Sequence, residues 1–305
     1  MIFIRIEQLK YFVELAKYQS FSLAAKNLHI SQPSISQAIS NLEDELNVKL
    51  FERSRSGVKL TKIGRTLLKK TQSTLNLIQD IYDEAQAQTD ILNGSLKIAT
   101  IPSMSNAFLS DVLSIYKKKH PYVRIEVNED GSKQIMQDVI TNRVDIGLIS
   151  SQPGDQLDNR VEFRHLLTGT YMVCIGKNST VPLFNPMPVE IIAQEPIVTF
   201  IENFRQHEYL KKLLNTDHFN IMLTTGQTET TKKLITEGVA IGFYPNFSIM
   251  NNAYVQSGDI IPLEIQNNDL ILLFGWIRLK NRHMSKASKE FIKVLKMAIQ
   301  NKGFS

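Results

Sequence analysis

The stretch that decides the fold of the amino-terminal region spans residues 20–46 and reads SFSLAAKNLHISQPSISQAISNLEDEL. Its pattern predicts a short helix over 21–28, a tight turn, and a second helix that Ser31 caps. Pro33 fits the first turn of this second helix, where its missing N–H has no partner to lose. One apolar face recurs at helical spacing and is formed by Ile35, Ile39, Leu42 and Leu46. Asn47 then ends the helix, because asparagine tolerates the left-handed conformation of a helix cap.

The opposite face of the second helix indicates what this region binds. Its first half presents short hydroxyl and amide side chains, namely Gln32, Ser34, Ser36, Gln37, Ser40 and Asn41. Such groups can hydrogen-bond to base edges in a major groove, and Pro33 can contact thymine methyls or phosphates. The last turn is expected to present Glu43, Asp44 and Glu45, which phosphates would repel, so only the first half can enter a groove. This arrangement is typical of a helix-turn-helix recognition helix, and the alternative is an ordinary solvated polar face.

The segment after this helix predicts a two-stranded wing over residues 48–61. Two short β-prone pieces flank a polar turn that contains Gly57. The cationic residues of the wing are Arg53, Arg55 and Lys59. At the tip or the edges of the wing, these side chains would reach phosphates or a minor groove.

The distribution of charge supports a polyanionic partner for this region. Residues 1–70 hold 12 Lys or Arg against 6 Asp or Glu, whereas the remaining residues hold 23 against 24. An excess of cations confined to the first quarter of the chain favours a polyanion for that quarter alone. The alternative is a solvated basic surface.

Residues 61–92 contain no proline and a single glycine, and they predict one long helix. A heptad seam can be traced along it through Leu68, Thr71, Leu75, Ile78, Tyr82, Ala85, Thr89 and Leu92. An apolar seam that extends beyond a compact domain needs a partner helix, so the pattern predicts a homodimer through this helix. The alternative is that the seam packs on its own domain.

From residue 93 onward, β-prone runs alternate with helical patterns. Strands are expected over 96–100, 123–127, 144–149, 171–175, 197–201, 220–224, 239–244 and 270–277, and helices near 104–119, 133–142, 205–215, 228–236 and 285–299. This order predicts mostly parallel sheets with crossover helices, arranged as two similar lobes. Ligands usually bind such lobes in the crevice at the carboxyl ends of the strands. The strand end at Thr100 and the segment from Thr199 to Phe204 each lead into the start of a helix, which favours a carboxylate, sulfate or phosphate there.

Length and composition exclude several classes of protein. A chain of 305 residues exceeds what one hydrophobic core usually organises, and 43% hydrophobic with 21% charged residues is typical of a folded globular protein. The longest near-apolar run, over 270–277, is too short for a membrane helix, and the charged start does not suit a secretory signal. Cys174 is the only cysteine, so we expect neither a disulfide nor a thiolate zinc cluster. We therefore expect a cytoplasmic protein with no cofactor, no metal and no membrane partner.

The sequence also argues against an enzyme. It contains no dinucleotide, Walker A or nucleophile-elbow motif. Residues 176–179 read GKNS but lack the upstream glycine of a phosphate loop, whose place Tyr171 takes. The histidines show no pairing at metal-ligand spacing, and Cys174 in its apolar run is interpreted as a core residue.

Residues 9–68 resemble the winged helix-turn-helix of the LysR-type transcriptional regulators. The resemblance is densest over 20–36, 41–46 and 50–53, and it resumes at Leu60, Thr61 and Gly64. The family's length and its two-lobed, periplasmic-binding-protein-like α/β part extend the resemblance, more loosely, over the rest of the chain. In many members a cation stands where this chain has Gln37, so the base preference at that position is its own.

The resemblance implies a ligand-responsive, sequence-specific regulator that binds an operator in double-stranded DNA. The residues implied to contact DNA are Gln32, Pro33, Ser36, Gln37 and Arg53, to which the residue pattern adds Ser34, Arg55 and Lys59. A small-molecule effector is implied between the lobes, with contacts at Thr100, Ser103, Met104, Ser150, Thr199, Glu202 and Gln227. Glu202 would disfavour a pure anion and favours an amine or a mixed-charge ligand. The resemblance further implies that dimers pair into tetramers and that RNA polymerase is a partner.

The expected organisation is a winged helix-turn-helix over 1–60, a linker and dimerisation helix over 61–92, and an effector-binding domain over 93–305. The first lobe of that domain would comprise about 93–165 and 270–305, and the second about 166–269. Two alternatives stay open. One is a solute-binding or enzymatic α/β protein whose basic head docks other proteins, and the other is an architectural protein that binds DNA of any sequence.

Overall fold

The computed structural model describes residues 4–54, 57–86, 92–201, 205–216, 218–280, 282 and 284–304. The chain divides into two compact units, Met1–Gln88 and Thr89–Ser305, each with its own core. Within the described ranges, no helix combines the length and the apolar character needed to cross a membrane. The finer domain boundaries stay predictions.

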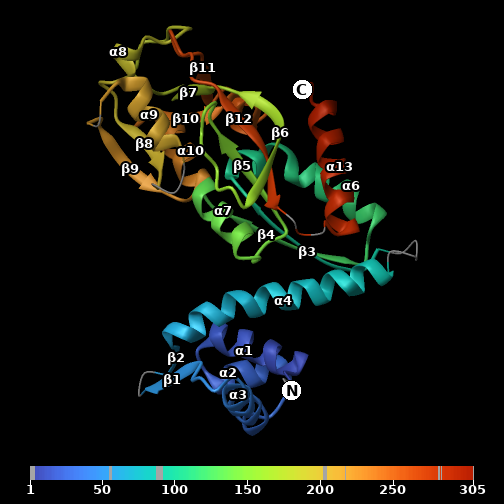
Figure 1. The fold of residues 1–305 in the computed structure, drawn as a ribbon. Coiled ribbons are helices and arrows are strands. Elements are labelled where there is room, and N and C mark those ends of the chain that lie inside the picture. Colours follow the sequence, from blue (N-terminus) through green and yellow to red (C-terminus); the bar gives the residue numbers. More distant parts are fainter. Residues whose placement is uncertain are drawn as a thin grey trace. The chain divides into compact units, whose positions relative to one another are not determined.

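The first unit is a helical head with a small β-hairpin (Figure 1). Its elements are α1 (Ile6–Tyr18), α2 (Phe21–Leu28), α3 (Gln32–Leu46), β1 (Phe51–Ser54), β2 (Gly57–Leu60) and α4 (Lys62–Gln86). Ser31 caps α3 by accepting a hydrogen bond from the N–H of Ser34, and Asn47 ends it with a left-handed φ of 51°. The rings of Phe12 and Phe51 meet edge to face at 5.5 Å and pack the hairpin onto α1. The predicted helices, caps and wing are confirmed.

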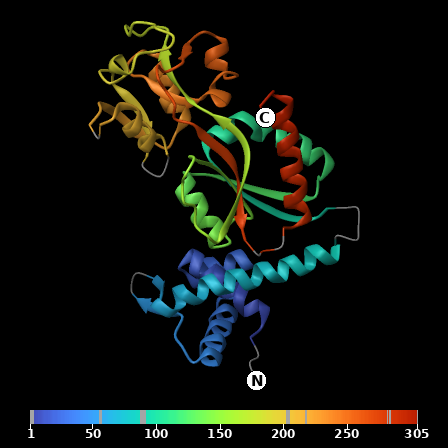
Figure 2. The same cartoon turned by 45° about the horizontal axis from the view of Figure 1, so that its top comes forward.

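The second unit contains a five-stranded sheet in the order β4-β3-β5-β12-β6. Its strands are β3 (Gly94–Thr100), β4 (Val123–Glu129), β5 (Ile146–Ser151), β6 (Val161–Gly169) and β12 (Leu272–Leu279). One face is covered by α7 (Ser132–Ile140), whose Ile135 and Val139 pack against Gly147. The other face is covered by α13 (Lys286–Asn301), with α6 (Ser110–Lys119) beside it (Figures 1 and 2). A short α5 (Pro102–Met104) and a π-helical turn η1 (Ser105–Leu109) lead into α6. These elements form the first lobe.

This sheet is mixed, which corrects the prediction of a mostly parallel one. Strands β3, β4 and β5 are parallel, but β12 runs antiparallel to both β5 and β6. The sequence did not predict β6, because Glu162, Arg164 and His165 interrupt its apolar pattern. In the structure, β6 forms the edge of the sheet, where such side chains remain in solvent.

The elements between β6 and β12 form the second lobe, which has two small sheets. One sheet is antiparallel and consists of β10 (Gly242–Pro245), β7 (Tyr171–Gly176) and β11 (Ile260–Leu263). The other is a parallel pair of β8 (Ile197–Phe200) and β9 (Ile221–Thr225). The helices are α8 (Val189–Ile192), α9 (Gln206–Leu214), α10 (Thr228–Thr236), α11 (Asn246–Ile249) and α12 (Ala253–Gln256). Strands and helices thus alternate in both lobes, but the lobes differ in the number and size of their sheets.

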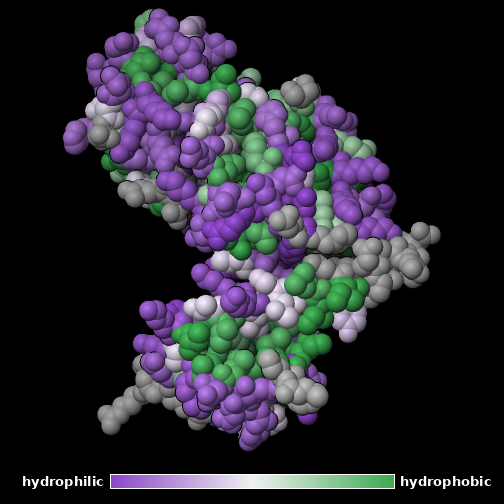
Figure 3. Space-filling view, viewed as in Figure 1, coloured by the Kyte–Doolittle hydropathy of each residue, from purple (hydrophilic) through white to green (hydrophobic). Residues whose placement is uncertain are grey.

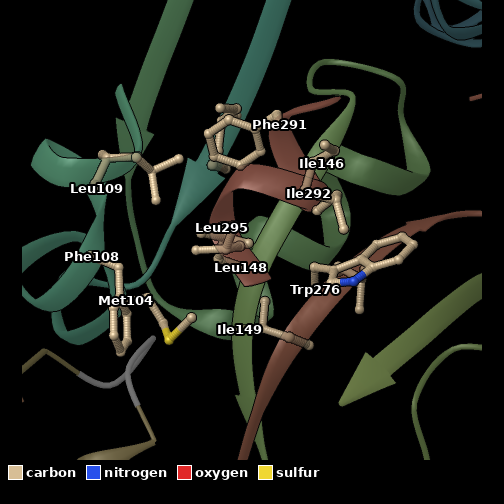
Figure 4. Close-up of a cluster of buried hydrophobic side chains, with 14 of the residues drawn as sticks. Met104, Phe108, Leu109, Ile146, Leu148, Ile149, Trp276, Phe291, Ile292 and Leu295 are labelled. Atoms are coloured by element: carbon tan, nitrogen blue, oxygen red, sulfur yellow. The ribbon is translucent and has the colours of Figure 1, made fainter. Parts of the chain in front are cut away.

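The core of the first lobe lies between the sheet and α13. Figure 4 shows Phe291 and Leu295 of α13 close to Ile146 and Leu148 of β5, and all four side chains are buried. Complete burial of a side chain of this size stabilises the fold by about 1.5–3 kcal/mol. This packing gives the β-strands, and the residues at their ends, fixed positions.

Candidate DNA-binding surface and interlobe cavity

The first half of α3 presents a polar surface. Its exposed residues are Gln32, Pro33, Ser34 and Gln37, and Ser36 is half-buried. The hydroxyl of Ser22 in α2 donates to Oε1 of Gln32 at 2.8 Å, and Nε2 of Gln37 donates to Oδ1 of Asn41 at 2.8 Å. Each bond orients one glutamine amide and leaves its other polar atom for a base edge.

Glu43 is buried, which corrects the prediction that the last turn of α3 presents it. The residue is 8% exposed, and its Oε1 accepts hydrogen bonds from the N–H groups of Leu50 at 2.8 Å and Phe51 at 3.2 Å. Its Oε2 pairs with Nζ of Lys49 at 2.8 Å. This carboxylate therefore joins the end of α3 to the start of the wing. The next residue, Asp44, is exposed as predicted.

Two of the three predicted cations of the wing, Arg53 and Lys59, lie on the β1–β2 hairpin. Lys59 is exposed in β2 and is paired in register with Glu52. Arg53 is paired in register with Val58, and only its backbone is described. Arg55 lies outside the described residues. Contacts of all three with DNA stay predictions.

Helix α4 exposes apolar residues both on the traced seam and beside it. Leu68 packs against the core of the first unit, and Leu92 is buried in the core of the first lobe. The seam positions Ala85 and Thr89 fall outside the described side chains. Tyr82, Leu77 and Ile81 are the exposed large side chains in the second half of α4, and Figure 3 shows apolar surface there. Leu92 is therefore wrong as a seam residue, and Thr71 is buried. Leu75 and Ile78 are half-buried and Tyr82 is exposed, so this part of the seam stays a prediction.

A cavity of about 50 Å³ lies between the two lobes of the second unit. The first lobe contributes the polar residues Ser103, Asn106, Ser132 and Ser150, and the second contributes Arg205, Gln206 and Thr228. Aromatic walls come from Tyr171, Phe200, Phe243, Tyr244 and Phe274. The cavity lies where strand ends and helix starts of both lobes meet, which is the crevice expected from the order of the elements.

Two of the seven predicted effector residues, Ser103 and Ser150, line this cavity. Thr100 and Thr199 are fully buried and lie outside the lining. Thr199 donates from Oγ1 to Oε1 of Gln206 at 3.0 Å, so it supports a lining residue from behind.

The other predicted effector residues lie elsewhere. Met104 is fully buried in the core of the first lobe, where Figure 4 shows it beside Phe108. Gln227 precedes α10 and accepts a hydrogen bond from Thr230 at 3.1 Å, whereas its neighbour Thr228 lines the cavity. Glu202 lies outside the described residues. Contact of these residues with an effector stays a prediction, and neither Met104 nor Gln227 lines the cavity.

The sequence did not single out Arg205, although it lines the cavity. Nη1 of Arg205 donates to Oδ2 of Asp155 in an ion pair, and the two side chains are 13% and 25% exposed. Nε of Arg205 is buried without a hydrogen-bond partner. Asp155 follows β5 in the first lobe, and Arg205 directly precedes α9 in the second, so this pair joins the lobes. The one available signal was a cation four residues after the end of the predicted strand over 197–201.

Burial also affects other titratable groups near the cavity. It raises the pKa of the phenols of Tyr171 and Tyr244 above the ordinary value, which already leaves a phenol neutral at pH 7. It also raises the pKa of the Cys174 thiol, which lies in the core as predicted. No group of three or more His, Cys, Asp or Glu side chains in the described ranges is placed to hold a metal ion.

Comparison with known proteins places both units in one family. The model of the bacterial regulatory helix-turn-helix protein, lysR family, matches residues 6–65, and that of the LysR substrate binding domain matches residues 90–300. The HTH-type transcriptional regulator YoaU of Bacillus subtilis is 28% identical over 96% of this chain and 98% of its own. The transcriptional dual regulator GltC of the same organism is 26% identical over 94% of each chain.

Solved structures share the fold. A full-length OxyR from Pseudomonas aeruginosa matches with a TM-score of 0.76 at 21% identity, covering 98% of this chain and 95% of its own. Full-length CbnR in complex with its target DNA matches with a TM-score of 0.66 at 18% identity, covering 96% and 99%. Because its matches to these two family models together span most of its length, the chain belongs to the LysR-type transcriptional regulators.

Proposed function

We propose that this regulator reads its operator with the first half of α3 and responds to a small molecule in the interlobe cavity. The observation that carries the proposal is the division of α3. Its first half is exposed and uncharged, its apolar face is buried, and Glu43 ties its end to a wing that bears Lys59. A groove-reading helix flanked by a phosphate-binding wing needs this arrangement.

Gln37→Ala should relax base preference at one operator position, at a cost of about 1–3 kcal/mol for the preferred base pair. The exposed amide is positioned by Asn41 and can meet a base edge. Lys59→Ala should instead weaken binding to every sequence and flatten the dependence of log affinity on log salt by about one unit. Mobility shift with the upstream region of its own gene, with single-base operator variants and with random duplexes measures both effects.

These measurements also separate the alternatives. Equal losses on every duplex for the two variants would contradict the assignment of Gln37 as a reader. Equal affinity of the unaltered protein for operator and random duplexes would favour an architectural protein. No salt-sensitive retardation at all, together with turnover of a metabolite, would favour a solute-binding or enzymatic protein.

We propose that the effector binds between Ser103 and Ser150 on one wall and the second lobe on the other. A ligand that binds only the folded state raises the melting temperature by mass action. A thermal-shift screen of metabolites should therefore yield a stabilising compound, and Ser103→Ala should reduce its shift. A shift that Ser103→Ala leaves unchanged would place the compound outside this cavity.

We propose further that the protein is a homodimer through α4, with tetramers formed from such dimers. Exposed Leu77 and Ile81, one helical turn apart, provide apolar surface for a partner helix. Sedimentation measurements distinguish monomer, dimer and tetramer. A cytoplasmic location, RNA polymerase as a partner and the absence of enzymatic activity are proposed from the family alone.

A further inference from the structure

Arg205 is the only charged residue among the described residues that line the interlobe cavity. Its guanidinium is mostly buried, and its Nε has no hydrogen-bond partner. A guanidinium carries five N–H donors in a planar fork that matches the two oxygens of a carboxylate. Asp155 engages this fork through one oxygen on Nη1. A second carboxylate would therefore find the Nε–H donor that the protein itself leaves unsatisfied.

The remaining walls favour a compact, apolar body on that carboxylate. Phe200, Phe243 and Phe274 provide aromatic surface, and the phenols of Tyr171 and Tyr244 add uncharged rings. A cavity of about 50 Å³ accommodates only a small ligand. A cation at one wall and aromatic rings at the others match a small carboxylate better than a sugar or a polyamine.

We propose that the cavity binds a compact monocarboxylate through Arg205, and that Asp155 competes with this ligand for the guanidinium. This inference rests on the proposed effector site. The competition follows from charge, because two carboxylates beside one partly buried cation repel each other while sharing its attraction. This ligand class differs from the amine or mixed-charge ligand that Glu202 suggested.

The same competition couples ligand binding to the arrangement of the two lobes. Asp155 is held in its own loop by the N–H of Gln152 at 2.7 Å, so it stays with the first lobe when it loses Arg205. Two further contacts join α9 to the first lobe, between Lys133 and Glu208 at 2.5 Å and between Lys212 and Gln152. A carboxylate that occupies Arg205 removes one of these three attachments, and by linkage the lobe arrangement sets the affinity for the carboxylate.

Isobutyrate tests the inference on the full-length protein. Sodium isobutyrate should raise the melting temperature relative to sodium chloride of equal ionic strength, whereas isobutyramide and isobutylammonium chloride should not. Arg205→Gln should abolish the shift. Asp155→Asn should increase isobutyrate affinity roughly tenfold or more, because charge-assisted bonds to Arg205 are then free of competition. Isothermal titration measures that affinity.

Lys133→Gln is the matched control, because it removes another cation from a lobe-crossing ion pair without altering the lining. It should leave the isobutyrate shift in place. Loss of the shift in Lys133→Gln as well, retention in Arg205→Gln, or equal shifts from the amide or the ammonium compound would overturn the inference. So would the absence of isobutyrate binding in both the unaltered protein and Asp155→Asn. A metabolite whose shift needs Ser103 but not Arg205 would reject the carboxylate and leave the effector site standing.

Discussion

Glu43→Ala should destabilise the DNA-binding unit by about 2–4 kcal/mol, because it leaves two buried N–H groups without their acceptor. Both groups, on Leu50 and Phe51, now donate to the same carboxylate oxygen. Hydrogen exchange at these two amides should accelerate in the variant, and urea denaturation followed by helix content gives the loss of stability. The wing should also lose its fixed position relative to α3, so operator affinity should fall.

Asp44→Ala is the control for this prediction. Asp44 lies in the same turn, carries the same charge and is exposed. Its removal should change stability by no more than about 0.5 kcal/mol. Since both variants remove one negative charge from the same turn, a loss of DNA affinity in Glu43→Ala alone assigns the effect to the attachment of the wing. Equal exchange rates at the Leu50 and Phe51 amides in both variants would refute that attachment.

Gly176→Ala should destabilise the second lobe by about 2–4 kcal/mol, because a Cβ at this position meets backbone rather than a movable side chain. The added carbon would lie 1.9 Å from the carbonyl oxygen of Ile235 in α10. Either β7 or α10 must move, and these elements carry Tyr171 and Thr228 to the cavity. Thermal melting should show the loss, and stabilisation by any cavity ligand should weaken with it.

Gly226→Ala provides the comparison within the same lobe. A Cβ there meets no atom within 4 Å, and the backbone is not in the left-handed region. This variant should melt within a few degrees of the unaltered protein, as surface substitutions usually do. If Gly176→Ala melted like Gly226→Ala, β7 and α10 would not be packed as closely as the structure has them.

Local patterns predicted the head well because its elements are specified by neighbours in sequence. Ser31 caps α3 and Asn47 ends it through bonds within a few residues, and the apolar period of α3 identifies its buried face. The burial of Glu43 was not predicted, because a glutamate within an acidic run is usually exposed to solvent. Its burial depends on the chain folding back after α3, which brings the N–H groups of residues 50 and 51 to the Glu43 carboxylate.

The sequence predicted the position of the cavity but only some of the residues that line it. Strand order located the crevice, and Ser103 and Ser150 fall on its wall. Thr100 and Thr199 are strand-end residues, and whether such a side chain faces the crevice or the interior depends on packing that sequence spacing does not report. Arg205 is positioned by an ion pair with Asp155, which lies 50 residues away in the sequence. No local sequence pattern predicts a pair at that separation.

The antiparallel pairing of β6 with β12 has a consequence for how this unit is built. Leu272 lies directly opposite Gly169 in the register of the two strands, so the chain leaves the first lobe and re-enters it at adjacent points. The second lobe is thus an insertion between two neighbouring strands of one sheet. A tight hairpin turn in its place would join the same two strands. Such an excision would leave a gap at the Phe247 ring, which now packs between Phe108 and Phe274. A minimal single-lobe protein would need a replacement for that ring before it could stand alone.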